Sequence, residues 1–223
     1  MPNITREKTA VKVLHLICSP KGHASRSAAI SRHLVQKIIA ARQGSEVAVR
    51  CLNALTMPHV DREFSLASRA GGTAKADNGS LLLSEELVAE VVESDAIVLS
   101  TPLHNLSFPS ALKAWIDHVV RPDVTFRYRG REMVGLVADK PVFVVMSSGG
   151  NRWGDNDQDF LKPYLKAMFA AMGILSVEFF GLPSHFVSDG AGIVTATDAM
   201  TLLADSRPVI EHSAVHELWS QFW

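Results

Sequence analysis

Short apolar runs alternate along this chain with stretches in which apolar residues recur every three or four positions. The runs predict buried strands, and the recurrence predicts amphipathic helices. The predicted strands span residues 11–18, 46–52, 95–101, 141–146 and 174–180. The predicted helices span residues 27–41, 84–94, 109–120 and 159–172, the second of them with Ser84 as its N-cap. This alternation indicates an α/β fold, a doubly wound parallel sheet of five strands with helices on both faces.

Two segments between these elements have weaker patterns. Residues 55–80 lack a clear period and are expected to form a long connection with at most one helical turn. Residues 124–128 and 133–137 predict a small hairpin that turns around Arg129 and Gly130. Neither segment changes the expected fold class.

The end of the chain adds two more helix candidates, at residues 197–205 and 208–222. The length of the chain suits one well-filled core. Residues 1–223 are therefore expected to form a single domain. A loose N-terminal arm at 1–10 and a helical C-terminal extension from about 182 to 223 are expected to flank its body.

In a parallel sheet the loops that follow the strands meet at one edge, and this is where doubly wound folds bind ligands. Three loops are expected at that edge: residues 19–27, 102–108 and 147–153. Each is rich in hydroxyl, amide or glycine groups, which can approach and hydrogen-bond a small ligand. Their convergence predicts one binding site.

The first loop has the composition of a phosphate-binding cradle. Ser19, Ser25 and Ser27 offer hydroxyls, and Gly22 allows a close approach of the main chain. The helix that follows begins with N–H groups that have no partner inside it. A simpler interpretation is that one serine only caps this helix, but three hydroxyls and a glycine together favour phosphate. Neither the G-x-x-x-x-G-K-[ST] nor the G-x-G-x-x-G motif is present, which leaves a monophosphate.

Cys18 offers a different chemistry, because small protein-tyrosine phosphatases carry a catalytic cysteine on the same turn, as C-x5-R-S. Here the arginine is Arg26, and the motif reads C-x7-R-S. The two additional residues would move the guanidinium away from a phosphate held at the thiolate. A small buried strand residue is therefore the preferred interpretation of Cys18, and a phosphatase is a minor hypothesis.

The second loop suits the edge of a flat heterocycle. Pro102 and Pro109 stiffen its ends, two leucines between them supply an apolar floor, and Asn105 can both donate and accept hydrogen bonds. Taken alone, the same residues fit an ordinary strand-to-helix connection equally well. The third loop begins Ser147-Ser-Gly-Gly, and its glycines let a planar ligand lie close to the main chain.

Composition narrows the classes of partner. The 22 lysines and arginines against 23 aspartates and glutamates give a formal net charge of −1. This balance provides no basic face for nucleic acid or for an anionic membrane. The N-terminal residues resemble neither a signal peptide nor a membrane span. With Cys18 and Cys51 as the two cysteines, a disulfide framework is not expected, so a cytoplasmic location is predicted.

The last helix candidate carries two histidines, His212 and His216, at a spacing that can hold a metal ion. No third ligand is evident beside them, so a solvated helix face is favoured and no metal is predicted. The same segment has an apolar stripe that is expected to dock on the body of the protein or on a second copy. The stripe consists of Val215, Leu218, Trp219 and Phe222.

Four segments, in order, give the chain a specific resemblance: S-P-K-G-H-A-S-R-S, T-P-L-H-N-L-S-F-P-S-A-L-K-A-W-I-D, V-T-F-R-Y and S-S-G-G. From about residue 11 to residue 180 the chain resembles the FMN-dependent NADH-azoreductase, or NAD(P)H:quinone oxidoreductase, family. The resemblance implies a flavodoxin-like fold of strand order 2-1-3-4-5, a homodimer and non-covalently bound FMN. It also implies NADH or NADPH as electron donor and a quinone or azo compound as the small-molecule substrate.

The resemblance also assigns residues to the cofactor. Those that match the family's phosphate-binding residues are Ser19, Ser25, Arg26 and Ser27. Those that match its loops along the flavin ring are Leu103, His104, Asn105, Leu106, Ser147, Ser148, Gly149 and Gly150. Tyr128 and Trp153 fall where the family builds its substrate pocket, partly across the dimer interface. His104 and Ser148 replace the family's Tyr and Arg, which bears on substrate range more than on FMN binding.

The implied reaction is a two-electron ping-pong transfer, in which a hydride passes from NAD(P)H to the flavin and two electrons then pass to the acceptor. The cofactor carries this chemistry, so no protein residue is assigned as a catalytic acid or base. The alternative is a flavodoxin-type electron carrier that binds FMN and has no substrate of its own. Such carriers rely on a charged docking face, which a net charge of −1 does not favour.

Overall fold

The structure, a computed structural model, describes residues 10–40, 43–69, 79–148 and 159–182. The strands are β1 (Lys12–Cys18), β2 (Glu46–Leu52), β3 (Ala96–Pro102), β4 (Phe126–Arg129), β5 (Glu132–Gly135), β6 (Val142–Ser147) and β7 (Val177–Leu182). The helices are α1 (Arg26–Ala40), α2 (Arg62–Arg69), α3 (Gly79–Glu93), α4 (Ser110–Val119) and α5 (Leu161–Met172), with a short 3-10 helix η1 (Gly22–Ala24) ahead of α1.

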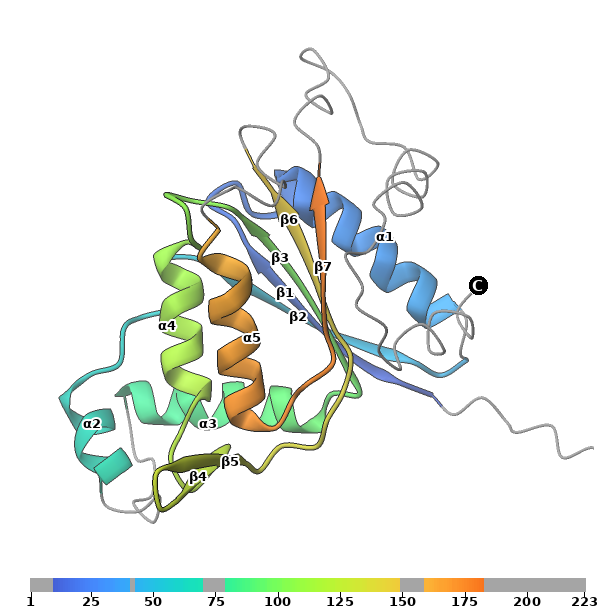
Figure 1. Ribbon diagram of the computed structural model, residues 1–223. Coiled ribbons are helices and arrows are strands. Elements are labelled where there is room, and N and C mark those ends of the chain that lie inside the picture. The colour runs from blue at the N-terminus through green and yellow to red at the C-terminus, as the bar shows by residue number, and fades with distance from the viewer. Residues whose placement is uncertain (1–9, 41–42, 70–78, 149–158, 183–223) are drawn as a thin grey trace, which may run out of the picture.

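Five parallel strands form the central sheet in the order β2-β1-β3-β6-β7. Since β4 and β5 form a separate hairpin, this is the predicted order 2-1-3-4-5, which is confirmed. Helix α1 covers one face of the sheet, and α3, α4 and α5 cover the other (Figure 1). Parallel strands all end at the same edge, which we call the carboxyl edge. The opposite edge, where the strands begin, is the amino edge.

Each face of the sheet has its own apolar core. The core under α1 contains Ile30, Leu34 and Ile38, which recur at helical spacing along one side of that helix. The core under α3, α4 and α5 is larger and includes Trp115 and Phe169, whose ring centroids are 6.4 Å apart. The central strand β3 is buried over six of its seven residues, as expected for a strand covered on both faces. Among the described helices, none is both long and apolar enough to cross a membrane.

Helix α3 begins at Gly79, five residues before the predicted start, so the assignment of Ser84 as its N-cap is wrong. Ser84 lies within the helix and is fully buried, and its hydroxyl donates a hydrogen bond of 2.6 Å to the carbonyl of His118 in α4. A serine inside a helix normally competes with the backbone. Here a long-range partner in the neighbouring helix satisfies its hydroxyl, and the sequence pattern around Ser84 does not reveal that partner.

Two other boundaries differ from the predicted ones. The region 55–80 contains a full helix, α2. Among the described side chains of this helix, only Phe64 is buried. Strand β7 begins at Val177, three residues later than expected. Ile174 still belongs to the end of α5, because its N–H donates to the carbonyl of Phe169 after Gly173 has turned into the left-handed conformation.

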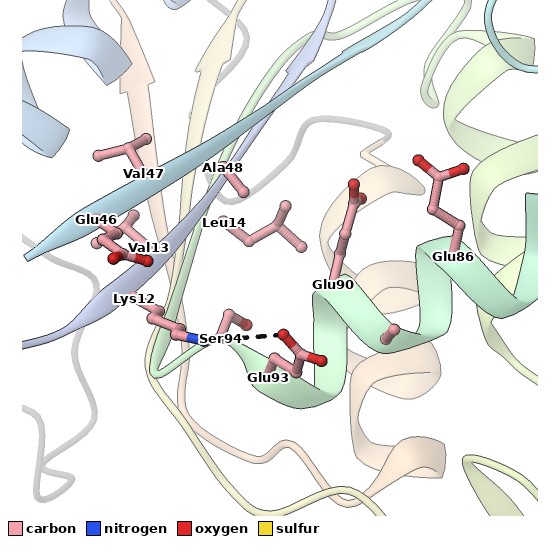
Figure 2. Close-up of a pocket in the computed structure, with 11 residues that line it drawn as sticks. Lys12, Val13, Leu14, Glu46, Val47, Ala48, Glu86, Glu90, Glu93 and Ser94 are labelled. Carbon is pink, nitrogen blue, oxygen red and sulfur yellow. Dashed lines mark ion pairs between the residues drawn. The ribbon is translucent and has the colours of Figure 1, made fainter.

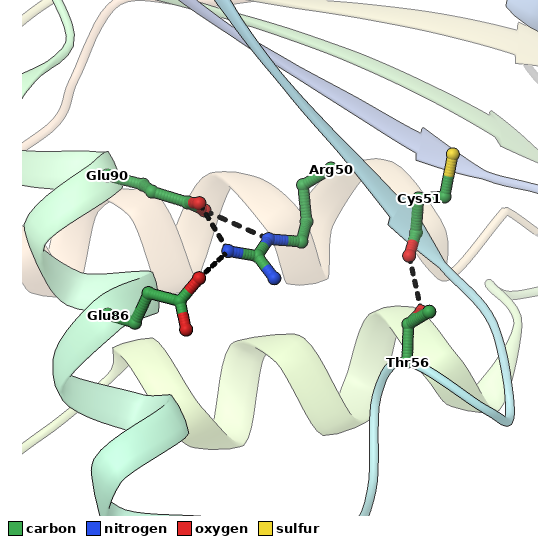
Figure 3. A network of polar contacts seen from close by, with 5 residues as sticks. All are labelled: Arg50, Cys51, Thr56, Glu86 and Glu90. Atoms are coloured by element: carbon green, nitrogen blue, oxygen red, sulfur yellow. Dashed lines mark hydrogen bonds and ion pairs between the residues drawn. The ribbon is translucent and has the colours of Figure 1, made fainter.

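The edge strand β2 is tied to α3 by Arg50. Figure 3 shows its guanidinium between the carboxylates of Glu90 and Glu86; the Arg50 Nε–Glu90 Oε2 distance is 3.2 Å and the Nη2–Glu86 Oε1 distance is 2.5 Å. The hydrogen bonding that Arg50 donates to Glu90 is the main reason that the pKa of Arg50 is raised. Apart from Leu52, no side chain of β2 is fully buried. The ion pairs therefore supply an attachment to α3 that apolar packing provides elsewhere in the sheet.

Asp61 joins the starts of α2 and α3. Its carboxylate accepts a hydrogen bond from the N–H of Phe64 at 2.8 Å and another from the N–H of Ser80 at 3.0 Å. Its own N–H donates to the Ser80 hydroxyl at 3.1 Å. These bonds, the one from Phe64 foremost, hold the pKa of Asp61 below its ordinary value.

We expect Asp61→Ala to lower the melting temperature, because two helices lose a capping group. A carboxyl with a lowered pKa in the folded state stabilises the protein above its unfolded pKa, and this stabilisation is lost as the pH falls through the folded pKa. The difference between wild type and Asp61→Ala should therefore be complete near neutral pH and shrink below about pH 4. Thermal unfolding followed by circular dichroism measures it, with the exposed Glu63→Ala as control. A pH-independent difference would contradict the role of the carboxylate.

The hairpin β4–β5 lies at the amino edge of the molecule (Figure 1). Helices α4 and α5 run antiparallel to the strands, so their C-terminal ends reach this edge, and the hairpin packs there. The N–H of Val137, two residues after β5, donates to the carbonyl of Met172 at the end of α5. The predicted hairpin is confirmed, with its turn at Gly130 and Arg131.

Candidate functional site

The first loop folds into a compact turn between β1 and α1. The N–H of Gly22 donates to the carbonyl of Ser19 at 2.9 Å, and the N–H of Lys21 donates to the Ser19 hydroxyl at 3.2 Å. Gly22 has a φ of +51°, a conformation that glycine adopts without strain. Ser25 then takes an extended conformation, and its hydroxyl accepts the N–H of Ala28 at 3.1 Å. Ser25 is therefore the N-cap of α1, which begins at Arg26, one residue before the predicted start.

At this turn the observed cap is compatible with the predicted phosphate site. Ser19, Ser25 and Ser27 are each at least nine-tenths buried, and the hydroxyls of Ser25 and Ser27 are 3.2 Å apart. Ser25 satisfies the N–H of Ala28, while the N–H of Ser27 finds no acceptor among the described residues. A backbone donor and clustered hydroxyls at a helix N-terminus fit a phosphate group. Arg26 lies on the exposed side of the same turn.

Cys18 is fully buried at the end of β1, in the core under α4. Burial raises the pKa of its thiol to about 12, against the weaker opposing effects of hydrogen bonds to Thr101 and to Leu112. A thiol with this pKa carries almost no thiolate near neutral pH, and the thiolate is the nucleophile that a cysteine phosphatase requires. Cys18 is therefore the buried strand residue that the sequence favoured, and the phosphatase hypothesis has no nucleophile.

The second loop contains a two-residue turn with both central residues in the left-handed region. His104 and Ser107 exchange backbone hydrogen bonds of 2.9 and 3.0 Å across the turn, while Asn105 and Leu106 have φ values of 50° and 65°. These are the features of a type I′ turn. Asparagine tolerates this conformation, whereas a leucine in it costs about 1 kcal/mol. The loop is therefore more sharply defined than a plain connection.

Two main-chain hydrogen bonds attach this turn to neighbouring elements. The N–H of Leu103 donates to the carbonyl of Ser147 at the end of β6, at 2.7 Å. The N–H of Phe160, just before α5, donates to the carbonyl of Leu106 at 2.9 Å. The second loop and the start of the third thus lie together at the carboxyl edge, with Ser148 buried beside them. Phe160 could not be found from the sequence, because a backbone donor leaves no signature in the residue type.

The remaining assigned residues divide into two groups. Gly149, Gly150 and Trp153 lie outside the described residues, as do His212 and His216 of the candidate metal spacing. Tyr128 is described, is 63% exposed and sits on the β4–β5 hairpin at the amino edge. The structure therefore does not bring Tyr128 to the loops of its own chain (Figure 1).

A groove of about 340 Å³ lies at the amino edge, between β1, β2 and α3 (Figure 2). Glu46, Glu86, Glu90 and Glu93 line it, and Lys12 contributes the one positive charge among its lining residues. Its carboxylates would repel a phosphate, and it is separated from the three loops by the length of the strands. In the described part of the chain no three His, Cys, Asp or Glu residues are grouped so as to hold a metal ion.

Comparison with known sequences places the chain in a family. A family model described as flavodoxin-like fold matches residues 11–200. FMN-dependent NADH:quinone oxidoreductase 2 of Cupriavidus pinatubonensis is 39% identical over 171 residues, which cover 75% of this chain and 83% of that protein. FMN-dependent NADH:quinone oxidoreductase 5 of Burkholderia lata is 37% identical over 181 residues, which cover 80% of this chain and 88% of that one.

Solved structures agree with the fold. An azoreductase of Bacillus anthracis superimposes with a TM-score of 0.71 at 20% sequence identity, covering 88% of this chain and 96% of that one. An FMN-dependent NADH-azoreductase of the same species, solved in complex with FMN, gives a TM-score of 0.69 at 22% identity, covering 87% and 93%. The match of the family model and the similarity to the two relatives agree with the order of strands. The chain therefore belongs to the flavodoxin-like family of FMN-dependent NADH:quinone oxidoreductases.

Proposed function

We propose that this protein is an FMN-dependent NAD(P)H oxidoreductase that reduces quinones, azo compounds or both. The observation that carries the proposal is the start of α1, where buried serine hydroxyls and a backbone N–H without an acceptor in the described chain face the carboxyl edge. Relatives of 37–39% identity over more than four-fifths of their own length have names that state the same cofactor and reaction.

In this proposal the first loop holds the phosphate of FMN. The hydroxyls of Ser19, Ser25 and Ser27 and the N–H of Ser27 donate hydrogen bonds to its oxygens, and the positive end of the α1 dipole favours the charge. Arg26 adds a positive charge from the exposed side of the turn. The buried position of the serines strengthens each of these bonds, because little water competes for them.

The second and third loops hold the flavin ring. Leu103 and Leu106 give it an apolar surface, His104 and Asn105 are exposed at the turn and available to its polar edge, and Ser148 lies beside it. The third loop would continue this surface through Gly149 and Gly150. The type I′ turn, attached on both sides by main-chain hydrogen bonds, fixes where these groups point. Rigid placement of this kind reduces the entropy lost when the ring binds.

Bound FMN would supply a ring that accepts a hydride from NADH or NADPH and delivers two electrons to a quinone or an azo compound. Because the cofactor carries the redox chemistry, we assign binding and orientation to the protein and proton supply to water. We also propose a cytoplasmic location, because the two cysteines form no disulfide.

The first test is a visible absorption spectrum of the purified protein, followed by NADH under anaerobic conditions. We expect a flavin spectrum that bleaches with NADH, and its return when a quinone is added in the absence of any partner protein. A flavin that remains unchanged with both NADH and NADPH would support the electron carrier instead. Failure to bind added FMN would overturn the proposal.

We expect Asn105→Ala to weaken FMN binding about tenfold and His104→Tyr to change it much less. Asn105 combines a donor and an acceptor with a residue type that tolerates a φ of 50°. His104 occupies a position at which the resembling family has Tyr. Fluorescence titration of the apoprotein with FMN measures both dissociation constants.

Asn105→Gly separates the side chain from the backbone in this comparison. Glycine keeps the left-handed turn and removes the amide. If Asn105→Gly binds FMN as well as the wild type, then the turn matters and the amide does not. If His104→Tyr has the larger effect, the roles given to the two residues are wrong.

We propose that the active form is a homodimer in which Tyr128 serves the site of the neighbouring copy. Tyr128 is exposed on a hairpin at the amino edge, and its ring contacts Phe126 edge-on at 5.4 Å between centroids. An exposed tyrosine on a well-anchored hairpin is suited to a contact with another molecule. It has no path to the loops of its own chain, because the sheet lies between them.

We expect Tyr128→Ala to raise the KM for a quinone about tenfold while FMN affinity stays unchanged. Leu175→Ala, which removes another exposed apolar side chain from the same edge, is the control and should change neither value. Sedimentation velocity on the wild type should report a dimer. A fully active monomer would contradict the shared site.

A further inference from the structure

A buried histidine interrupts the apolar pattern of the central strand β1. His15 is 2% exposed and faces α1, where its Nε2 lies 2.8 Å from the hydroxyl oxygen of Ser31, which is fully buried. The core around the pair is apolar, with Val13 and Ile30 among its members. A polar pair in such a place costs desolvation and needs complete hydrogen bonding to persist.

A third group, the carbonyl of Ala28, bears on the direction of the hydrogen bond between the pair. The Ser31 hydroxyl lies 3.1 Å from the carbonyl oxygen of Ala28, one turn earlier in α1. A carbonyl can only accept, so we assign the single hydroxyl proton of Ser31 to Ala28. In this assignment the oxygen of Ser31 accepts from His15, whose imidazole carries a proton on Nε2.

Ala28 also contacts the phosphate cradle. The carbonyl of Ala28 accepts from Ser31, and the N–H of Ala28 donates to the hydroxyl of Ser25 at 3.1 Å. The Ser25 hydroxyl is in turn 3.2 Å from that of Ser27. The backbone of Ala28 thus joins the His15–Ser31 pair in the middle of the fold to the two serines that face the carboxyl edge.

We propose that His15 is a positioning residue for the phosphate of FMN, acting through Ser31 and the first turn of α1. The pair fixes the rotation of α1 on β1, and this rotation sets where the hydroxyls of Ser25 and Ser27 point. Apolar packing alone leaves a helix some freedom to turn and slide on a sheet, whereas a directed hydrogen bond removes it. The inference rests on the proposed function, because it takes the ligand of the cradle to be a phosphate monoester.

The test measures the dissociation constants of FMN and of riboflavin, which has the same ring and no phosphate. His15→Val, the residue type expected in a buried strand, should weaken FMN binding about tenfold and leave riboflavin binding unchanged. Ser31→Ala should have the same effect, and the double variant should be no worse than either single one. His15→Gln can still donate to Ser31 and should recover part of the FMN affinity.

Ser94→Ala is the matched control. Ser94 is also buried within reach of a carbonyl three residues earlier, Val91 at 3.0 Å, but it lies at the end of α3 near the amino edge. This variant should leave FMN binding unchanged. In a nitrogen NMR spectrum of the wild type, the His15 signal should be that of an imidazole protonated on Nε2.

The outcomes distinguish a failure of the His15 role from a failure of the proposed function. Additive losses in the double variant, or equal losses of FMN and riboflavin affinity, would overturn the positioning role of His15. So would a His15→Val variant that binds FMN as the wild type does. A wild type that binds neither compound would instead overturn the proposed function.

Discussion

Replacing Ser25 with aspartate is expected to reduce FMN affinity by at least about 100-fold while the protein remains folded. Aspartate caps helices as well as serine does, so it can still accept the N–H of Ala28 and keep the start of α1 in place. Its carboxylate would, however, lie within the cradle that holds a phosphate in the proposed complex. Two like charges about 4 Å apart near a protein surface repel by about 4 kcal/mol.

Two comparisons make this experiment specific. Ser25→Asn caps the helix equally well and carries no charge, so its FMN affinity should stay within about threefold of the wild type. Riboflavin binding should be the same in all three proteins, because the substituted side chain faces a phosphate that riboflavin lacks. If the Ser25→Asp protein loses riboflavin binding as well as FMN binding, the substitution has distorted the loop, and charge repulsion is not the cause of the lost affinity.

Replacing Gly135 with alanine is expected to lower the free energy of unfolding by at least about 3 kcal/mol. A Cβ atom at this position would lie 2.1 Å from the backbone nitrogen of Gly173 and 2.3 Å from its Cα. Both neighbours are main-chain atoms, so no side chain can rotate away to make room. The hairpin would have to separate from the end of α5, where Val137 and Met172 share a hydrogen bond.

Gly130→Ala tests the same substitution in the turn of the same hairpin. A Cβ there would meet no atom within 4 Å, although the φ of +65° is unfavourable for alanine. Gly130→Ala should lower the free energy of unfolding by about 1 kcal/mol, which is the cost of placing alanine in this backbone conformation. Urea unfolding measures both variants, and equal losses of stability would contradict the close approach of Gly135 to Gly173.

The order of elements could be predicted from the sequence because apolar runs and helical spacing are local properties. The five strands of the sheet, their order and the hairpin are confirmed. The start of α3 was predicted wrongly because it depends on a long-range contact. Ser84 has the residue type of a cap, and only its contact with the carbonyl of His118 explains its place inside the helix. Helix α2 was expected as no more than a helical turn, because it buries so little apolar surface.

In the candidate site, too, residue types could be read from the sequence, whereas conformations and long-range contacts could not. The hydroxyls of the first loop and Asn105 of the second were visible as residue types, and their assignment to FMN stays a prediction. The left-handed Leu106 was not visible, since leucine does not favour this conformation. The contact between His15 and Ser31 was not visible either, because it joins a strand to a helix across 16 residues of chain.

The placement of the hairpin at the amino edge, away from the loops at the carboxyl edge, has a genetic consequence. In the proposed dimer each site combines the cradle of one chain with Tyr128 of the other. An allele that encodes Ser25→Asp lacks a working cradle, and an allele that encodes Tyr128→Ala lacks the tyrosine. A cell that expresses both would assemble mixed dimers with one complete site each, so two recessive defects would complement each other within a single gene.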